Sequence, residues 1–334
     1  MKPKLLILND HEGALANAPG LKKLQQLADV TVMSKPISPA DDATLAQHHV
    51  LFALRERTTL DAEFFERCGK LELLLQSGGH AYHLDRAAAS QRGIIVALGR
   101  GAKRPMIIIP ELTFALILGL TRRLYPLHQQ MSEGRWPEEM GNSIHGKTLG
   151  ILGYGRHGKP IGRIARAFGM KIVAWDRGGD YSNDEPDVSR MSLPDLMVTS
   201  DVVSVHLRLS DESRGLIGRE LLSKMKPSAL FINTARGAIV DELALVEVLA
   251  EGRIAGAGLD VFASEPPSAE SPLRTLPNVL LTPHIGWKVS DLLHEWMDMA
   301  AVQLESYLAG SLDPKVILNP EALQIARDRM GGIA

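Results

Sequence analysis

The sequence is poor in cysteine, in aromatic residues and in net charge. It contains one cysteine, Cys68, in 334 residues, aromatic residues make up 5% of it, and its formal net charge is -2. A single cysteine cannot form a disulfide within the chain, which favours a reducing compartment, and we expect a cytoplasmic protein. A net charge near zero gives no overall basic field, so we expect no nucleic-acid partner.

Long hydrophobic segments are also scarce. The apolar run near the N-terminus covers only residues 5–8, which is too short for a secretory signal. The most apolar stretch, residues 106–120, contains Pro110 and Glu111 and is shorter than the ~20 residues that a membrane-spanning helix needs. We therefore expect a buried or interface helix here and no membrane partner.

The first hundred residues alternate between short apolar runs and helix-like segments. The apolar runs are residues 5–8, 30–33, 50–54, 71–75 and 94–97, and the helix-like segments are residues 21–28, 40–47, 61–67 and 85–92. Continuous apolar runs that alternate with helices are typical of a parallel sheet that is covered on both faces. This part of the chain therefore predicts an α/β domain with a doubly wound parallel sheet.

A second α/β series follows one long helical pattern at residues 110–131. Its strands are predicted at residues 148–152, 171–175, 202–206, 229–232, 255–259 and 279–281, and its helices at 160–168, 193–199, 219–225 and 241–250. A chain of this length fits two domains. The amphipathic segment 290–308 is predicted to be helical, and its pattern does not decide on which domain it packs.

A glycine-rich G-x-G-x-x-G segment comes directly after the predicted strand 148–152. Gly153 permits a sharp turn, Gly155 lets a pyrophosphate approach the backbone, and Gly158 lets the following helix pack close to the sheet. The free N–H groups and the positive dipole end of that helix then favour phosphate. The segment predicts a dinucleotide site.

Asp176 stands at the end of the next predicted strand, 18 residues after Gly158 (176 − 158). A carboxylate here accepts hydrogen bonds from the adenosine ribose and repels a 2′-phosphate, so NAD is the expected cofactor. Arg177 leaves NADP open, because a neighbouring arginine can contact that phosphate.

Three residues that suit hydride-transfer chemistry follow three predicted strands of the second series. Arg236, Glu265 and His284 each come just after the carboxyl end of a strand, which is the edge where open α/β sheets bind ligands. Reduction of a 2-keto acid needs a proton on the carbonyl oxygen, which a histidine can supply near neutral pH. A carboxylate stabilises the protonated imidazole, and an arginine matches a substrate carboxylate.

Each of these residues alone has a simpler structural interpretation, and only their common position favours catalysis. The histidines at 48 and 49 and at 80 and 83 have no third ligand at a suitable spacing, so no metal site is expected.

The sequence resembles the D-isomer-specific 2-hydroxyacid dehydrogenase family over nearly its whole length. The resemblance rests on residues 150–158 (GILGYGRHG), 231–237 (FINTARG), 258–262 with 265–266 (GLDVF and EP) and 283–286 (PHIG). It implies a flavodoxin-like substrate domain, residues 1–104 with 291–334, and an inserted Rossmann NAD domain, residues 105–290. It also implies a homodimer, with a helix near residues 110–123 at the interface, and a small 2-hydroxy or 2-keto acid as substrate.

The resemblance assigns roles to individual residues. Arg236 binds substrate, Glu265 pairs with the histidine, and His284 is the acid/base. Cofactor-binding residues would be Gly153, Gly155, Arg156, His157, Gly158, Asp176, His206, Thr234, Ala235, Arg236, Asp260, His284 and Gly286. Substrate-binding residues would be Gly78, Gly79, His80, Arg236 and His284.

The sequence departs from the family pattern at several positions, and two alternatives stay open. His80 replaces a glycine in the substrate loop, His157 an aliphatic residue in the glycine-rich turn, and Arg208 a proline. One alternative is a formate- or phosphite-type dehydrogenase, although formate enzymes pair the histidine with Gln rather than with a residue like Glu265. The other is a dinucleotide-sensing, corepressor-like binding protein.

Overall fold

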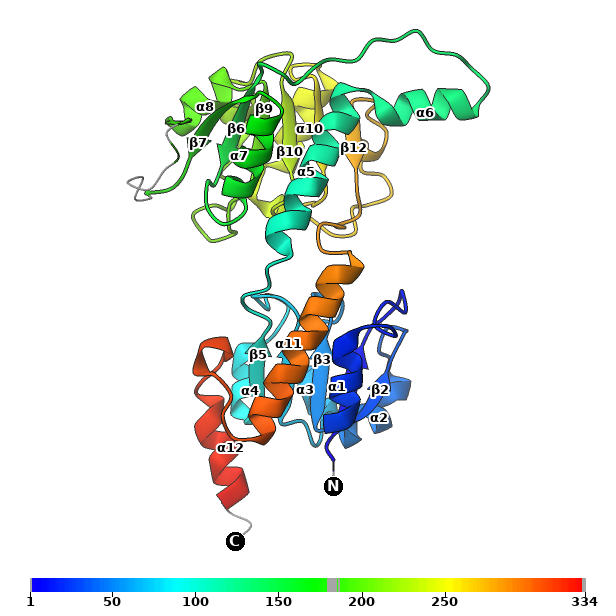
Figure 1. Cartoon of the computed structure of the whole chain (residues 1–334), viewed down its shortest axis with the longest axis vertical. Coiled ribbons are helices and arrows are strands. Elements are labelled where there is room, and N and C mark those ends of the chain that lie inside the picture. Colours follow the sequence, from blue (N-terminus) through cyan, green and yellow to red (C-terminus); the bar gives the residue numbers. More distant parts are fainter. Residues whose placement is uncertain (1, 179–184, 186, 332–334) are drawn as a thin grey trace. The chain divides into compact units, whose positions relative to one another are not determined.

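The computed structural model describes residues 2–178, 185 and 187–331. The chain forms two compact units, Met1–Arg104 with Val289–Ala334 (unit 1) and Pro105–Lys288 (unit 2). The second boundary lies two residues before the expected one. Each unit contains one parallel sheet with helices packed against it (Figure 1), which confirms the predicted pair of α/β folds.

Unit 1 has a five-stranded sheet in the order β2-β1-β3-β4-β5, and all neighbours are parallel. This is the flavodoxin-like order. The strands are buried apolar runs, apart from the edge strand β2. The elements of unit 1 are β1 (Lys4–Leu8), α1 (Pro19–Leu27), β2 (Asp29–Val32), α2 (Asp42–Gln47), β3 (Val50–Ala53), α3 (Ala62–Arg67), β4 (Leu73–Gln76), α4 (Arg86–Gln91), β5 (Ile95–Leu98), α11 (Ser290–Leu308) and α12 (Ala322–Gly331).

The C-terminal helix α11 packs in unit 1, beside α1 (Figure 1). The two backbones approach so closely at Gly20 that an added Cβ would lie 2.4 Å from the carbonyl carbon of Met297. Further along, Asn319 accepts the Val96 N–H (2.9 Å) and donates to the Ile94 carbonyl (2.8 Å). These contacts show that the C-terminal helix packs in unit 1, which the amphipathic pattern of residues 290–308 did not decide.

Unit 2 has a seven-stranded parallel sheet in the order β12-β11-β10-β9-β6-β7-β8. The order reverses between β6 and β9, as in Rossmann domains. The three-residue strand β8 was not predicted from the sequence. The elements of unit 2 are α5 (Pro105–Thr121), α6 (Leu124–Ser132), β6 (Thr148–Leu152), α7 (Gly158–Ala167), β7 (Lys171–Trp175), β8 (Val188–Arg190), α8 (Leu193–Thr199), β9 (Val202–Val205), α9 (Arg219–Leu222), β10 (Leu230–Asn233), α10 (Glu242–Ala250), β11 (Gly256–Leu259) and β12 (Val279–Leu281).

The prediction of one helix over residues 110–131 is wrong. Two helices, α5 and α6, meet at a bend of 63°, where Arg123 adopts a left-handed conformation with φ of 54°. Figure 1 shows α6 and the segment after it as an arm that stands away from the sheet of unit 2. Within the described residues, no single helix is long and apolar enough to cross a membrane, and α5 and α6 qualify only as this bent pair.

Candidate active site

The glycine-rich turn lies between β6 and α7, and each of its glycines has a local reason. Gly153 has a φ of 98°, and a Cβ there would lie 2.8 Å from the carbonyl oxygen of His206. A Cβ on Gly158 would lie 2.2 Å from the carbonyl oxygen of Gly153. Around Gly155, in contrast, nothing lies within 4 Å of an added Cβ, so the backbone is open to a ligand. This cradle fits a dinucleotide pyrophosphate.

Two histidines lie around this turn. Burial lowers the pKa of His157, and the nearby charges of Arg156 and Arg236 lower it further. Burial also lowers the pKa of His206 to about 3, and its ring nitrogen lies 2.7 Å from the Ser204 hydroxyl. Both imidazoles are therefore neutral at physiological pH, and neither adds positive charge to the turn.

Asp176 directly follows β7 and lies beside the turn, where the sequence predicts it. One carboxylate oxygen accepts the Tyr154 N–H at 2.7 Å, and the other accepts an N–H of Arg190 at 2.5 Å. Arg190 lies on β8, and sequence reasoning missed it because that strand has only three residues.

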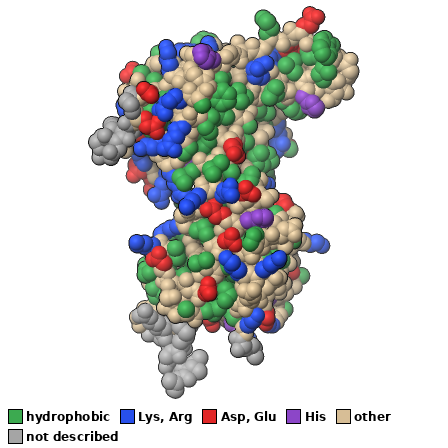
Figure 2. All heavy atoms as spheres, viewed as in Figure 1, with side chains coloured by type: hydrophobic (Ala, Val, Ile, Leu, Met, Phe, Trp, Pro, Cys, Tyr) green, Lys and Arg blue, Asp and Glu red, His purple; other side chains and the backbone are tan. Residues whose placement is uncertain are grey.

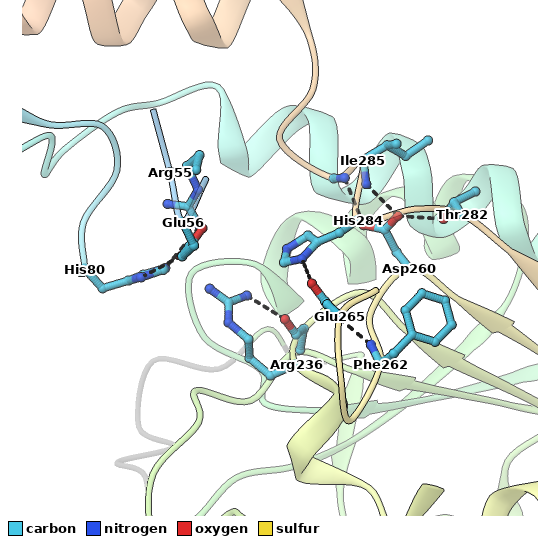
Figure 3. A network of polar contacts seen from close by, with 12 residues as sticks. Arg55, Glu56, His80, Arg236, Asp260, Phe262, Glu265, Thr282, His284 and Ile285 are labelled. Carbon is cyan, nitrogen blue, oxygen red and sulfur yellow. Dashed lines mark hydrogen bonds and ion pairs between the residues drawn. The ribbon is translucent and has the colours of Figure 1, made fainter. Parts of the chain in front are cut away.

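Arg236, Glu265 and His284 follow β10, β11 and β12, which are neighbours in the sheet, so the three loops leave the same edge (Figure 3). The His284 Nδ1 lies 2.5 Å from one oxygen of Glu265, and the other oxygen of Glu265 accepts the Phe262 N–H at 3.0 Å. The structure therefore brings the predicted imidazole and carboxylate into direct contact.

The charge state of Glu265 follows from these contacts. Burial would raise the pKa of its carboxyl, but the hydrogen bond and charge of His284, the Phe262 N–H and the charge of Arg236 outweigh it. The pKa lies below its ordinary value, so the group is a carboxylate at neutral pH. Because the charge of Arg236 contributes to this lower pKa, the Arg236 guanidinium acts electrostatically on the Glu265–His284 pair.

The loop that carries Arg236 is fixed from within. The buried Asn233 side chain donates to the Arg236 carbonyl oxygen and accepts the Ala235 N–H, both at 3.0 Å. The Thr234 hydroxyl lies 3.2 Å from that of Thr113 on α5. These contacts hold the loop through Asn233 and Thr234, and the Arg236 side chain itself donates one N–H to the Ala235 carbonyl oxygen at 2.6 Å.

Asp260 holds the loop that carries His284. It is 1% exposed, and its carboxylate accepts hydrogen bonds from the Thr282 hydroxyl (2.6 Å), the Ile285 N–H (2.8 Å) and the Gly286 N–H (2.9 Å) (Figure 3). The backbone of His284 has a φ of 49°, a left-handed conformation that residues other than glycine rarely adopt. Burial raises the pKa of Asp260 despite these three donors. The loop geometry around His284 therefore depends on this buried carboxyl group.

We expect the change of Asp260 to Ala to destabilise the protein by about 1–3 kcal/mol, because it leaves the buried Gly286 N–H and two part-buried donors without their acceptor. Urea unfolding of the whole chain measures this loss. The exposed Asp211, changed to Ala, is the matched control and should shift the midpoint little. Equal midpoints for the two variants would contradict the holding role of Asp260.

The predicted substrate loop, with Gly78, Gly79 and His80, follows β4 and lies in unit 1. Gly78 has a φ of 88°, and an added Cβ would lie 2.2 Å from a guanidinium nitrogen of Arg55. His80 lies 3.3 Å from both Arg55 and Glu56 through its two ring nitrogens. The sequence analysis did not single out Arg55 and Glu56, although they directly follow β3, the strand next to β4.

In the described residues, no group of three or more His, Cys, Asp or Glu side chains could hold a metal ion. Cys68 is buried, and burial raises its thiol pKa to about 12, so it is not a nucleophile at neutral pH.

Residues 114–286 match the family model described as the NAD-binding domain of D-isomer-specific 2-hydroxyacid dehydrogenases. The chain belongs to this family. It is 32% identical to a glyoxylate reductase of Korarchaeum cryptofilum, over 97% of this chain and 98% of that protein. It is 34% identical to a glycerate dehydrogenase of Methylorubrum extorquens, over 77% of this chain and 82% of that protein.

Solved structures of other proteins share the fold. The phosphoglycerate oxidoreductase of Vibrio cholerae superposes with a TM-score of 0.83 at 29% identity, over 92% of this chain and 99% of that one. The protein TT0316 of Thermus thermophilus superposes with a TM-score of 0.82 at 32% identity, over 94% of this chain and 99% of that one. The chain is thus an NAD-dependent 2-hydroxyacid dehydrogenase, an oxidoreductase that acts on a CH–OH group.

Proposed function

We propose that the chain interconverts a D-2-hydroxy acid and its 2-keto acid, with His284 as the acid/base. The observation that carries this proposal is the 2.5 Å contact between His284 Nδ1 and the ionised Glu265. NAD, when bound, supplies or accepts the hydride. The residues of the chain supply the proton, the orientation of the substrate and the charge around it.

In the reduction, protonated His284 donates its Nε2 proton to the carbonyl oxygen of the keto acid. In the oxidation, neutral His284 removes the hydroxyl proton at the same atom. Because Glu265 occupies the Nδ1 side, it fixes the ring, leaves Nε2 for the substrate and stabilises the imidazolium. Reduction should therefore be favoured at lower pH and oxidation at higher pH.

Arg236 would bind the substrate carboxylate and polarise the carbonyl group. Its guanidinium offers a planar set of donors that matches two carboxylate oxygens. In unit 1, the backbone N–H groups of Gly78, Gly79 and His80 would also take part in binding the substrate.

His80 would be neutral in this role. Arg55 always donates, so the His80 Nε2 that faces it must accept, and the ring proton then lies on Nδ1, 3.3 Å from an oxygen of Glu56. His80 would then shape the substrate site without adding a charge.

The predicted coenzyme contacts fit the same proposal. The amides of Arg156 and His157, at the start of α7, would bind the pyrophosphate together with the open backbone at Gly155. The nicotinamide ring would lie near Thr234, Ala235 and His206, with its carboxamide near Asp260. Asp176 would accept the adenosine ribose hydroxyls.

A panel of 2-keto acids tests the function, with glyoxylate, hydroxypyruvate and bulkier side chains, read by the absorbance of NADH. Formate and phosphite in the same assay test the alternative reactions. Tight NADH binding without turnover of any keto acid would favour the corepressor-like alternative. Turnover of one D-2-hydroxy acid but not of its L-enantiomer is the expected result.

We expect the change of Glu265 to Gln to lower kcat of keto-acid reduction and to move the pH at which this reduction declines downwards. The Glu265 oxygen lies 2.5 Å from the His284 Nδ1, and a neutral amide there no longer balances the positive charge that the ring carries as proton donor. The pH profile of kcat measures the shift. An unchanged profile with reduced kcat would mean that Glu265 only positions the ring.

We further propose a cytoplasmic homodimer whose interface includes α5, the helix that the resemblance places there, and the arm of unit 2 that follows it. The arm exposes large hydrophobic side chains, with Trp136 82% and Met140 89% exposed, and Figure 2 shows hydrophobic atoms at its surface. A cavity of about 730 Å³ lies at its base, lined by Leu120, Tyr125 and Leu280 among others. A second copy would cover this surface. Sedimentation equilibrium of the full chain measures the state.

A further inference from the structure

Asp176 is not an isolated negative charge in this structure. Its carboxylate has both oxygens engaged, one by the Tyr154 N–H and one by Arg190 at 2.5 Å. A carboxylate at the end of this strand excludes a 2′-phosphate by repulsion. Here the guanidinium of Arg190 balances that negative charge, so the electrostatic basis for exclusion is removed.

Arg190 is held at this place by a second contact. Its guanidinium carbon lies 5.0 Å from the centroid of the Tyr154 ring, and Tyr154 belongs to the glycine-rich turn itself and is 2% exposed. This cation–π contact with a buried ring holds the guanidinium next to the turn. A guanidinium has five N–H donors, so it can serve Asp176 and a further acceptor together.

A second arginine lies next to Asp176 in the chain. Arg177 reaches Glu212 at 3.0 Å and Ser210 at 3.3 Å. Figure 2 shows basic and acidic side chains together on the visible face of unit 2. A phosphate on the 2′-oxygen of a ribose at Asp176 would therefore meet guanidinium groups that already pair with carboxylates, and Arg190 is the one that contacts Asp176 itself.

We propose that Arg190 forms a subsite for the 2′-phosphate, so that the chain accepts NADPH as well as NADH. With NADH, Asp176 accepts the ribose hydroxyls. With NADPH, the phosphate takes N–H donors of Arg190, which keeps its pair with Asp176. This inference rests on the proposed placement of the ribose at Asp176, and it is independent of the proposed role of His284.

The test is the binding of two adenosine probes, 5′-AMP and adenosine 2′,5′-bisphosphate, measured by calorimetry on the full chain without substrate. We expect the wild type to bind the bisphosphate at least as tightly as AMP. The change of Arg190 to Gln should weaken binding of the bisphosphate by about 10- to 100-fold, as expected for lost charge-assisted hydrogen bonds. It should weaken binding of AMP by less than about 3-fold. The ratio of kcat/KM for NADPH to that for NADH should fall by the same factor.

Three further variants locate the effect. Arg163→Gln removes an exposed arginine of α7 that pairs with Glu185, and it should leave the ratio of the two probes unchanged. Arg177→Gln measures how much the neighbouring arginine contributes to binding of the bisphosphate. Asp176→Asn should weaken the binding of AMP and leave the binding of the bisphosphate unchanged.

Wild-type exclusion of the bisphosphate, or equal losses of both probes in Arg190→Gln, would overturn the proposal. Should Arg190→Gln fail to fold, Arg190→Lys keeps the charge without the planar fork and should weaken the bisphosphate selectively. Because the probes need no keto acid, this result is separate from the outcome of the substrate panel.

Discussion

The change of His284 to Ala should lower kcat for the preferred 2-keto acid by about 10²- to 10⁴-fold, the usual contribution of general acid/base catalysis. No other imidazole contacts Glu265 among the described residues, so nothing replaces the lost proton donor. NADH should still bind, because the glycine-rich turn and Asp176 do not depend on this side chain. Steady-state kinetics and fluorescence titration of NADH measure the two quantities separately.

The matched control for His284 is His11, an exposed histidine of unit 1 whose ring contacts the Ser34 carbonyl oxygen. His11→Ala should turn over like the wild type. A fully active His284→Ala, or a loss of turnover that simply follows a loss of NADH binding, would remove His284 from the acid/base role.

The change of Arg236 to Met should lower kcat/KM for the keto acid by about 10²- to 10³-fold, because two charge-assisted hydrogen bonds to the carboxylate are lost. The Arg236 loop should keep its shape, since Asn233 and Thr234 hold it through other contacts. Arg236→Lys keeps the charge but loses the fork, so its loss should be smaller. A second variant, Arg236→Ala, leaves space where the guanidinium stood, so guanidinium ions added to the assay should restore part of its activity.

Arg253 is a suitable control for Arg236, since it is exposed and pairs with Glu251 in a loop after α10. Its change to Gln should leave kcat/KM unaltered. An Arg236→Met enzyme that keeps kcat/KM for keto acids, or that loses NADH affinity and nothing else, would contradict substrate binding by this guanidinium.

The strands were the part of the fold that sequence predicted well. Runs such as residues 5–8 and 148–152 are apolar throughout because parallel strands are buried on both faces, and β1 and β6 occupy these positions. Glycines at 153 and 158 then marked the turn, since their close backbone contacts tolerate no side chain. These signals are local, so a single sequence carries them.

Other features depend on contacts that no local pattern contains. Apolar residues stand on both sides of the α5–α6 boundary, where only the three polar residues 121–123 intervene, but Arg123 turns the backbone left-handed and breaks the helix. The three-residue strand β8 gains its stability from β7 alongside it, and its own sequence is too short to show a period. The packing of α11 in unit 1 depends on its contacts with α1, among them the close approach at Gly20, far away in the chain.

The same distinction applies to the candidate site. Arg236, Glu265 and His284 could be proposed together because each follows a strand, and parallel strands present their carboxyl ends at one edge. The contact of Arg190 with Asp176, 14 residues apart (190 − 176), needs the side chains to be seen. So does the contact of Arg55 with Gly78, because it joins two different loops.

The route of the chain through its two units has a consequence for synthesis on the ribosome. Unit 2 is one continuous stretch, so it can fold as soon as it has emerged. Unit 1 must wait, because Gly20 meets Met297, which is made 277 residues later (297 − 20). At the roughly 5–20 residues per second of translation, the α1 surface that α11 covers stays bare for about 14 to 55 seconds. During that interval the nascent first half exposes apolar surface, which makes it a client for chaperones.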